Sequence, residues 1–94
     1  MKDFEDKRNE VAIIEKFQEY VKHTYEEHYE GKISPLEVFE SLGIAEDAYK
    51  ANIIKYLFRY QKKGNAKKDI FKIMHYSLLL YDLIEKQEEA QKNA

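Results

Sequence analysis

The stretch that decides the fold is residues 52–63, which read Asn-Ile-Ile-Lys-Tyr-Leu-Phe-Arg-Tyr-Gln-Lys-Lys. At about 100° per residue, a helix through this stretch separates its cations from most of its apolar side chains. The cationic face holds Asn52, Lys55, Tyr56, Arg59 and Lys63, and the apolar face holds Ile53, Ile54, Leu57, Phe58 and Tyr60. We expect the apolar face to enter the core. The cationic face has two interpretations, a solvated surface as in most amphipathic helices or a binding site for anions.

The composition constrains both interpretations. The 94 residues suit one small domain, which we expect to span residues 1–94, and 36% of them are charged. A net charge of −2 and a pI near 5.9 argue against general nucleic-acid binding. Any anion site is therefore expected to be local.

Cysteine usage and hydropathy set the expected compartment. The sequence contains no cysteine, no run of 18 apolar residues and no apolar signal segment at its start. We therefore expect a cytoplasmic protein with no disulfide, no thiolate zinc site and no membrane partner.

The fold class predicted from the sequence is all-α, a compact bundle of about four helices. Three glycines and one proline interrupt the chain, and no segment alternates like a strand. The expected helices cover residues 4–29, 35–42, a third segment that contains residues 52–63 and ends at Gly64, and residues 66–87. Ser34, Pro35 and Glu37 predict a capped start for the second helix, Gly43 its left-handed stop, and Asn65 a cap for the fourth. We expect residues 88–94 to fray.

The first and fourth helices carry the longest apolar stripes. In the first helix the stripe consists of Val11, Ile14, Phe17, Val21 and Tyr25, and it would extend about 35 to 40 Å. This helix is interpreted either as the interface of a homo-oligomer or as an ordinary intramolecular helix. The fourth helix is expected to be central, with a buried side of Ile70, Ile73, Met74, Ser77, Tyr81 and Ile84, widened by Leu79, Leu80 and Leu83.

Several kinds of active site are not supported by the sequence. No glycine-rich phosphate loop, nucleophile elbow or cysteine nucleophile is present. The acidic pattern Glu26-Glu27-x-x-Glu30 could bind magnesium, as in all-α pyrophosphohydrolases, but no second acidic helix accompanies it. His23, His28 and His75 lack zinc-ligand spacing, so we expect no metal site.

The order of motifs in the second half of the chain resembles a known family. The motifs are His28-Tyr29, then Gly31 and Ile33, then Asn52-x-x-Lys55-Tyr56-Leu57-x-Arg59, then Lys62 or Lys63 with Gly64, then Asp69-Ile70-x-Lys72, and then Tyr76. In this order they resemble the SaV-like family of small bacteriophage proteins, over about residues 27–85. The chain has Ala51 where that family commonly has Gly, and Ile73 where it commonly has Ala. Residues 1–26 lie outside the resemblance.

The resemblance implies nucleotide handling, because one phage member of that family resembles a nucleoside monophosphate kinase without a Walker loop. The candidate ligand-binding residues are His28, Tyr29, Asn52, Lys55, Tyr56, Arg59, Lys62, Lys72 and Tyr76. The cations would contact phosphates, Asn52 would read a base edge or the ribose, and the histidine and tyrosines would stack. For Asp69 we expect a salt bridge with Arg59 or Lys72 rather than a catalytic role.

Three functions follow from this site. The first is a non-catalytic sponge that sequesters a nucleotide or cyclic-nucleotide immune signal in the cytoplasm of an infected bacterial host, an anti-defence role. The second is a nucleotide kinase, the one case in which Mg²⁺ would be a cofactor. The third is a protein-interaction module that inhibits a host factor. We expect a homo-oligomer, no catalytic residue and no other cofactor.

Overall fold

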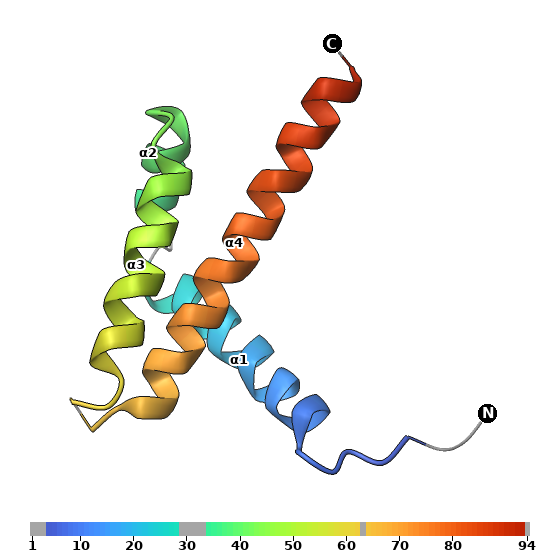
Figure 1. The fold of residues 1–94 in the computed structure, drawn as a ribbon, viewed down its shortest axis with the longest axis vertical. Helices are drawn as coiled ribbons and strands as arrows, with labels where there is room; N and C mark the ends of the chain where they lie inside the picture. Colours follow the sequence, from blue (N-terminus) through green and yellow to red (C-terminus); the bar gives the residue numbers. More distant parts are fainter. Residues whose placement is uncertain (1–3, 29–33, 63, 94) are drawn as a thin grey trace. The chain divides into compact units, whose positions relative to one another are not determined.

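The computed structural model describes residues 4–28, 34–62 and 64–93, with the side chains of Glu27 and His28 left outside this set. Four helices lie in the described ranges: α1 (Glu10–His28), α2 (Pro35–Ser41), α3 (Ala45–Arg59) and α4 (Ala66–Lys92). These ranges contain no strand. The prediction of an all-α fold with four helices is confirmed (Figure 1). The chain divides into two units, residues 1–32 and residues 33–94, which are described separately.

In the first unit, α1 begins six residues later than the sequence analysis predicted. Asn9 has φ = 58°, and the backbone N–H groups of Val11 and Ala12 donate to the Asp6 carboxylate at 3.1 and 3.2 Å. A carboxylate in this position satisfies N–H groups that the first helical turn leaves unpaired. The predicted start at Phe4 is therefore wrong, and α1 has 19 residues, or about 28 Å. The oligomer interface on this helix stays a prediction.

In the second unit, α2 begins and ends where local signals indicated. The Ser34 hydroxyl accepts from Leu36 N–H at 3.1 Å, and Pro35 occupies the first turn. The helix ends at Ser41, one residue before the predicted end, and Gly43 follows with φ = 73°. A left-handed glycine at this point lets the chain turn directly into α3.

The helices α3 and α4 run in opposite directions from the turn after Arg59 and pack against each other (Figure 1). The predicted third helix was too long, because α3 ends at Arg59 and residues 60–62 form a turn before Gly64, which has φ = 73°. Asn65 stands at the cap position of α4 as predicted, but its side chain makes no cap hydrogen bond.

The fourth helix continues through Lys92, five residues beyond its predicted end at Gln87, and the fraying of residues 88–94 stays a prediction. Residues 85–92 consist entirely of Glu, Lys, Gln and Ala, which have high helix propensity. An i,i+4 ion pair between Lys86 and Asp82, 2.9 Å long, adds support on the helix surface.

In the second unit, the face of α3 that packs against α4 is not the one that the sequence analysis predicted. Tyr49 and Tyr56 are buried, at 0% and 8% exposure, whereas Leu57 and Phe58 are 54% and 73% exposed. The prediction that the apolar face enters the core is therefore wrong for Ile54, Leu57 and Phe58. Tyr49, Tyr56 and Arg59 on the other face contact α4 instead. Cationic side chains can do this because their aliphatic stems are apolar.

On α4 the predicted buried side is exposed as well. Ile70, Tyr81 and Ile84 are 37%, 66% and 48% exposed, whereas Asp69 is fully buried. The prediction that this stripe lies in the core is wrong for these three residues, because α3 packs against another side of the helix. Among the described residues, no helix has both the length and the apolar character that crossing a membrane requires.

Candidate anion-binding site

The inner face of the α3–α4 pair is built from three tyrosine rings. Tyr49 and Tyr56 are seven residues apart on α3 and therefore share a face. Tyr76 of α4 contacts both, with ring centroids 6.0 Å from Tyr49 at 40° and 6.3 Å from Tyr56 at 15°. These distances suit tilted and offset-stacked aromatic pairs. The rings fix the relative position of the two helices at this point.

Three cationic groups surround the ring of Tyr56, and we call Lys55, Arg59 and Lys72 the cationic cluster. The ammonium nitrogens of Lys55 and Lys72 each lie 4.8 Å from the ring centroid, and the Arg59 guanidinium carbon lies 4.6 Å from it. All three distances fall within the range of a cation–π interaction. Two helices thus bring three positive charges to one nearly buried ring.

Arg59 is paired with the buried carboxylate of Asp69. Its Nε donates to Oδ2 at 3.2 Å and its terminal nitrogen donates to Oδ1 at 2.6 Å. These hydrogen bonds hold the pKa of Asp69 below its ordinary value of 3.8, against the opposing effect of burial, and the charges of Lys72 and Lys55 lower it further. The same hydrogen bonds raise the pKa of Arg59. The salt bridge expected for Asp69 is confirmed, with Arg59 rather than Lys72 as its partner.

The remaining charge of the cluster is positive. Within the described residues, neither Lys55 nor Lys72 forms an ion pair with a carboxylate, so Asp69 neutralises one of three cations. The two ammonium groups are at most about 10 Å apart, since each lies 4.8 Å from the same centroid. That separation is comparable to the Debye length of roughly 8 to 10 Å, so the two charges repel each other. An anion between them would relieve this repulsion.

The structure brings five of the nine candidate residues together: Lys55, Tyr56, Arg59, Lys72 and Tyr76. Asn52 lies one helical turn before Tyr56, and its side-chain amide donates to the Ala48 carbonyl at 2.9 Å. Lys62 is exposed in the turn after α3, where its backbone N–H donates to the Arg59 carbonyl at 2.8 Å.

The two remaining candidates belong to the first unit. His28 is the last residue of α1, and its side chain lies outside the described set, as does all of Tyr29. Whether they complete the site stays a prediction. The same holds for the acidic pattern at residues 26–30, most of which lies outside the described side chains.

Sequence reasoning missed Tyr49, whereas it had placed His75 on a polar edge of the fourth helix together with Lys72. Tyr49 is fully buried against Tyr76, and its seven-residue spacing from Tyr56 could have revealed it. His75, next to Tyr76, is partly buried, and desolvation lowers its pKa below the ordinary 6.5. Nothing in the local sequence distinguishes this histidine from a solvated one.

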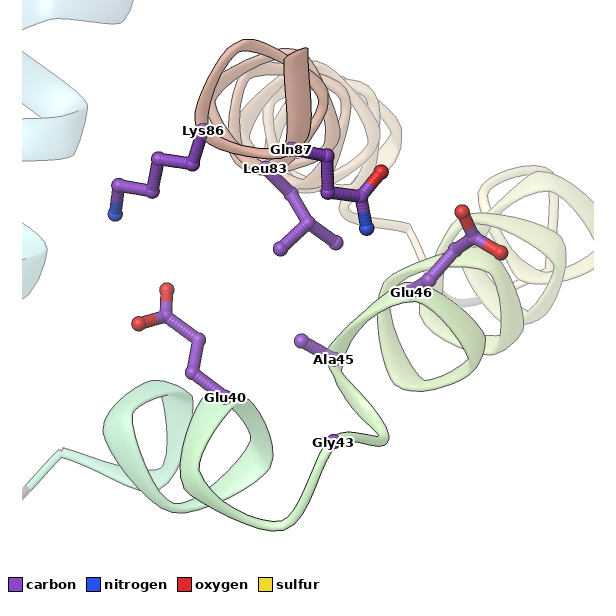
Figure 2. A pocket seen from close by; sticks show the side chains of 7 residues that line it. All are labelled: Glu40, Gly43, Ala45, Glu46, Leu83, Lys86 and Gln87. Carbon is purple, nitrogen blue, oxygen red and sulfur yellow. The ribbon is translucent and has the colours of Figure 1, made fainter. Parts of the chain in front are cut away.

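A separate pocket of about 350 Å³ lies between the α2–α3 turn and the later part of α4. Ala45 and Leu83 are at its centre, and Glu40 faces Lys86 across it (Figure 2). The hydrogen bond with Asp82 and the charges of Asp82 and Glu40 raise the pKa of Lys86. None of the nine candidate residues lines this pocket, and its two glutamates make it a poor phosphate site.

Across the described part of the chain, no three His, Asp or Glu side chains come together in a way that could hold a metal ion. The fold and the site thus define an all-α protein with a cationic and aromatic cluster between two antiparallel helices.

A family model described as a protein of unknown function, DUF3310, matches residues 21–77. This segment is more than half of the chain and contains the whole cationic cluster, so the chain belongs to the DUF3310 family. No curated protein and no solved structure matches the chain.

Proposed function

We propose that the protein binds a nucleotide through its phosphate groups at the cationic cluster. The observation that carries this proposal is that Lys55, Arg59 and Lys72 lie within 5 Å of one tyrosine ring, while among the described residues a single carboxylate, that of Asp69, is paired with them. Positive charges held this close repel one another, and a bound anion would compensate them.

The parts of the cluster have different roles in this proposal. Asp69 holds the Arg59 guanidinium in place through two hydrogen bonds. Lys55 and Lys72 retain their three donors each and can turn toward a phosphate as mobile point charges. The ring of Tyr56 is 8% exposed, which leaves little area for stacking, so we assign it the role of positioning the cations.

We further propose that the nucleotide is held without turnover, as a sponge for a nucleotide or cyclic-nucleotide immune signal would do. A general base works best when its pKa lies near the working pH. The pKa of Asp69 is instead lowered, and both of its oxygens accept from Arg59. This arrangement favours binding over phosphoryl transfer, with a magnesium-dependent nucleotide kinase as the alternative. The phage context and the resemblance to SaV-like proteins remain part of this proposal.

A second candidate function is a protein-interaction module. It is favoured by the outer face of α3, where Ile54, Leu57 and Phe58 are 55%, 54% and 73% exposed. Contiguous exposed apolar side chains often mark protein-binding surfaces.

Calorimetric titration with mono-, di- and cyclic nucleotides tests the proposal. We expect one class of nucleotide to bind and to be recovered intact after the protein is denatured. A ligand recovered phosphorylated or cleaved would refute the sponge and support the kinase. No affinity for any nucleotide, together with capture of a host protein that Phe58→Ser abolishes, would support the interaction module instead.

A further inference from the structure

The outward side of α4 carries a regular apolar stripe, which we call the α4 stripe: Ile70, Met74, Ser77, Tyr81 and Ile84. Ile70, Tyr81 and Ile84 are 37%, 66% and 48% exposed, and neighbouring Leu78 is 51% exposed. The other side of this helix packs against α3 through Asp69 and Tyr76. The stripe is therefore a second apolar surface, separate from the cationic cluster.

The spacing of the stripe is that of a coiled-coil seam. Its members follow one another at steps of four, three, four and three residues, a period of 3.5. Alternating steps of three and four residues keep the stripe on one side of α4, so that a second helix can pack along it. The 27 residues of α4, about 40 Å, are long enough for such a pairing.

The distribution of charge along α4 indicates the orientation in which a second copy of this helix can pack on the stripe. Residues 66–79 contain three lysines and one aspartate, and residues 80–92 contain four acidic residues and two lysines. The first half therefore carries +2 and the second half −2, with histidine neutral. A parallel copy of α4 would place like charges side by side, whereas an antiparallel copy places each half beside its complement.

We propose that two copies of this chain associate through the α4 stripe, with the two α4 helices antiparallel about a two-fold axis near Ser77. Such an interface is self-complementary, as a two-fold axis requires. The small side chain of Ser77 lets the helices approach at the centre, while Ile70 of one copy lies toward Ile84 of the other. This inference does not depend on nucleotide binding.

Single cysteines test the proposal, because the natural chain contains none. Ser77→Cys places one thiol near the axis, and Lys67→Cys places one ten residues away, so that the two copies of position 67 would be about 30 Å apart. The probe is a bismaleimide that spans about 10 Å, close to the distance between packed helix axes. We expect efficient dimer crosslinking of Ser77→Cys and almost none of Lys67→Cys.

Other outcomes would overturn the proposal. Crosslinking at both positions would show a parallel pair. Crosslinking at neither position, with a monomeric mass under native conditions, would show that the stripe is covered by α1 of the same chain or left bare.

A substitution in the stripe gives an independent test by native mass spectrometry. Tyr81→Glu places a charge in the seam and is expected to raise the dimer dissociation constant at least tenfold. Gln87→Glu, which adds the same charge on the side of α4 that lines the pocket, is the matched control and is expected to leave the dimer intact. Equal effects of the two substitutions would contradict an interface at the stripe.

Discussion

The two faces of α3 differ in a way that amphipathic patterns alone do not explain. The inner face carries Tyr49, Tyr56 and Arg59, which pack on α4 through rings and a salt bridge. The outer face carries Leu57 and Phe58, which are more than half exposed. Three tyrosine rings and the Arg59–Asp69 pair thus lie where α3 meets α4, while the apolar residues of the outer face stay largely exposed. Substitutions on the two faces test whether they differ in this way.

The largest expected effect comes from removing an inner ring. Tyr49→Ala deletes a fully buried side chain and should lower the free energy of unfolding by about 3 to 5 kcal/mol. Phe58→Ala removes a ring of similar size from the outer face, where it is 73% exposed, and should cost less than about 1 kcal/mol. Urea denaturation of both variants measures the difference. Equal losses would mean that the outer face is covered.

The next effect comes from the buried pair of the inner face. Asp69→Asn removes the charge that holds Arg59 and leaves three uncompensated cations at Tyr56, so Tm should fall at pH 7, by less than in Tyr49→Ala. A Tm equal to that of the natural protein would show that Asp69 does not organise the cluster.

The same substitution should change the response to acid. Because the pKa of Asp69 is lowered in the folded state, the pair contributes stability that is complete above about pH 3.8 and is lost as pH falls through the lower folded pKa. Asp69→Asn should therefore show a smaller loss of stability below pH 4. The lowered pKa of His75 should reduce stability as pH falls below 6.5 equally in both proteins. Identical acid profiles below pH 4 would contradict the assignment.

The smallest effect on stability is expected from Lys55 and Lys72, which form no ion pair within the described residues. Lys55→Met and Lys72→Met keep the apolar stems and remove one of two repelling charges, so the free energy of unfolding should rise or stay within about 0.5 kcal/mol. If the lysines serve only as cation–π partners, the free energy of unfolding of each variant should instead fall by about 0.5 to 1 kcal/mol. Lys50→Met, which removes an exposed α3 lysine paired with Glu46, is the control for charge.

The sequence predicted those parts of the fold that local signals decide. Ser34 and Gly43 have conformational roles that depend on few neighbours, so α2 was placed to within one residue. The start of α1 was missed because the Asp6 cap resembles ordinary surface charge in the sequence.

The candidate site was predicted in part, for a related reason. Periodicity separated the two faces of α3 correctly but could not say which one meets α4, since that depends on Tyr76 and Asp69 in another helix. A salt bridge of Asp69 with Arg59 or Lys72 was predicted, and the packing of α4 on α3 selects Arg59. The convergence of Lys55 and Lys72 on one ring depends on how the helices cross, which no single segment encodes.

The most direct test of the central claim is a calorimetric titration of the natural protein, Lys72→Met and Lys50→Met with the nucleotide that binds best in the panel. The cationic cluster predicts that Lys72→Met weakens binding about tenfold or more, the loss of a charge-assisted contact, with no loss of stability. Lys50→Met should bind as the natural protein does. Equal affinities of all three proteins would contradict an anion site at Tyr56.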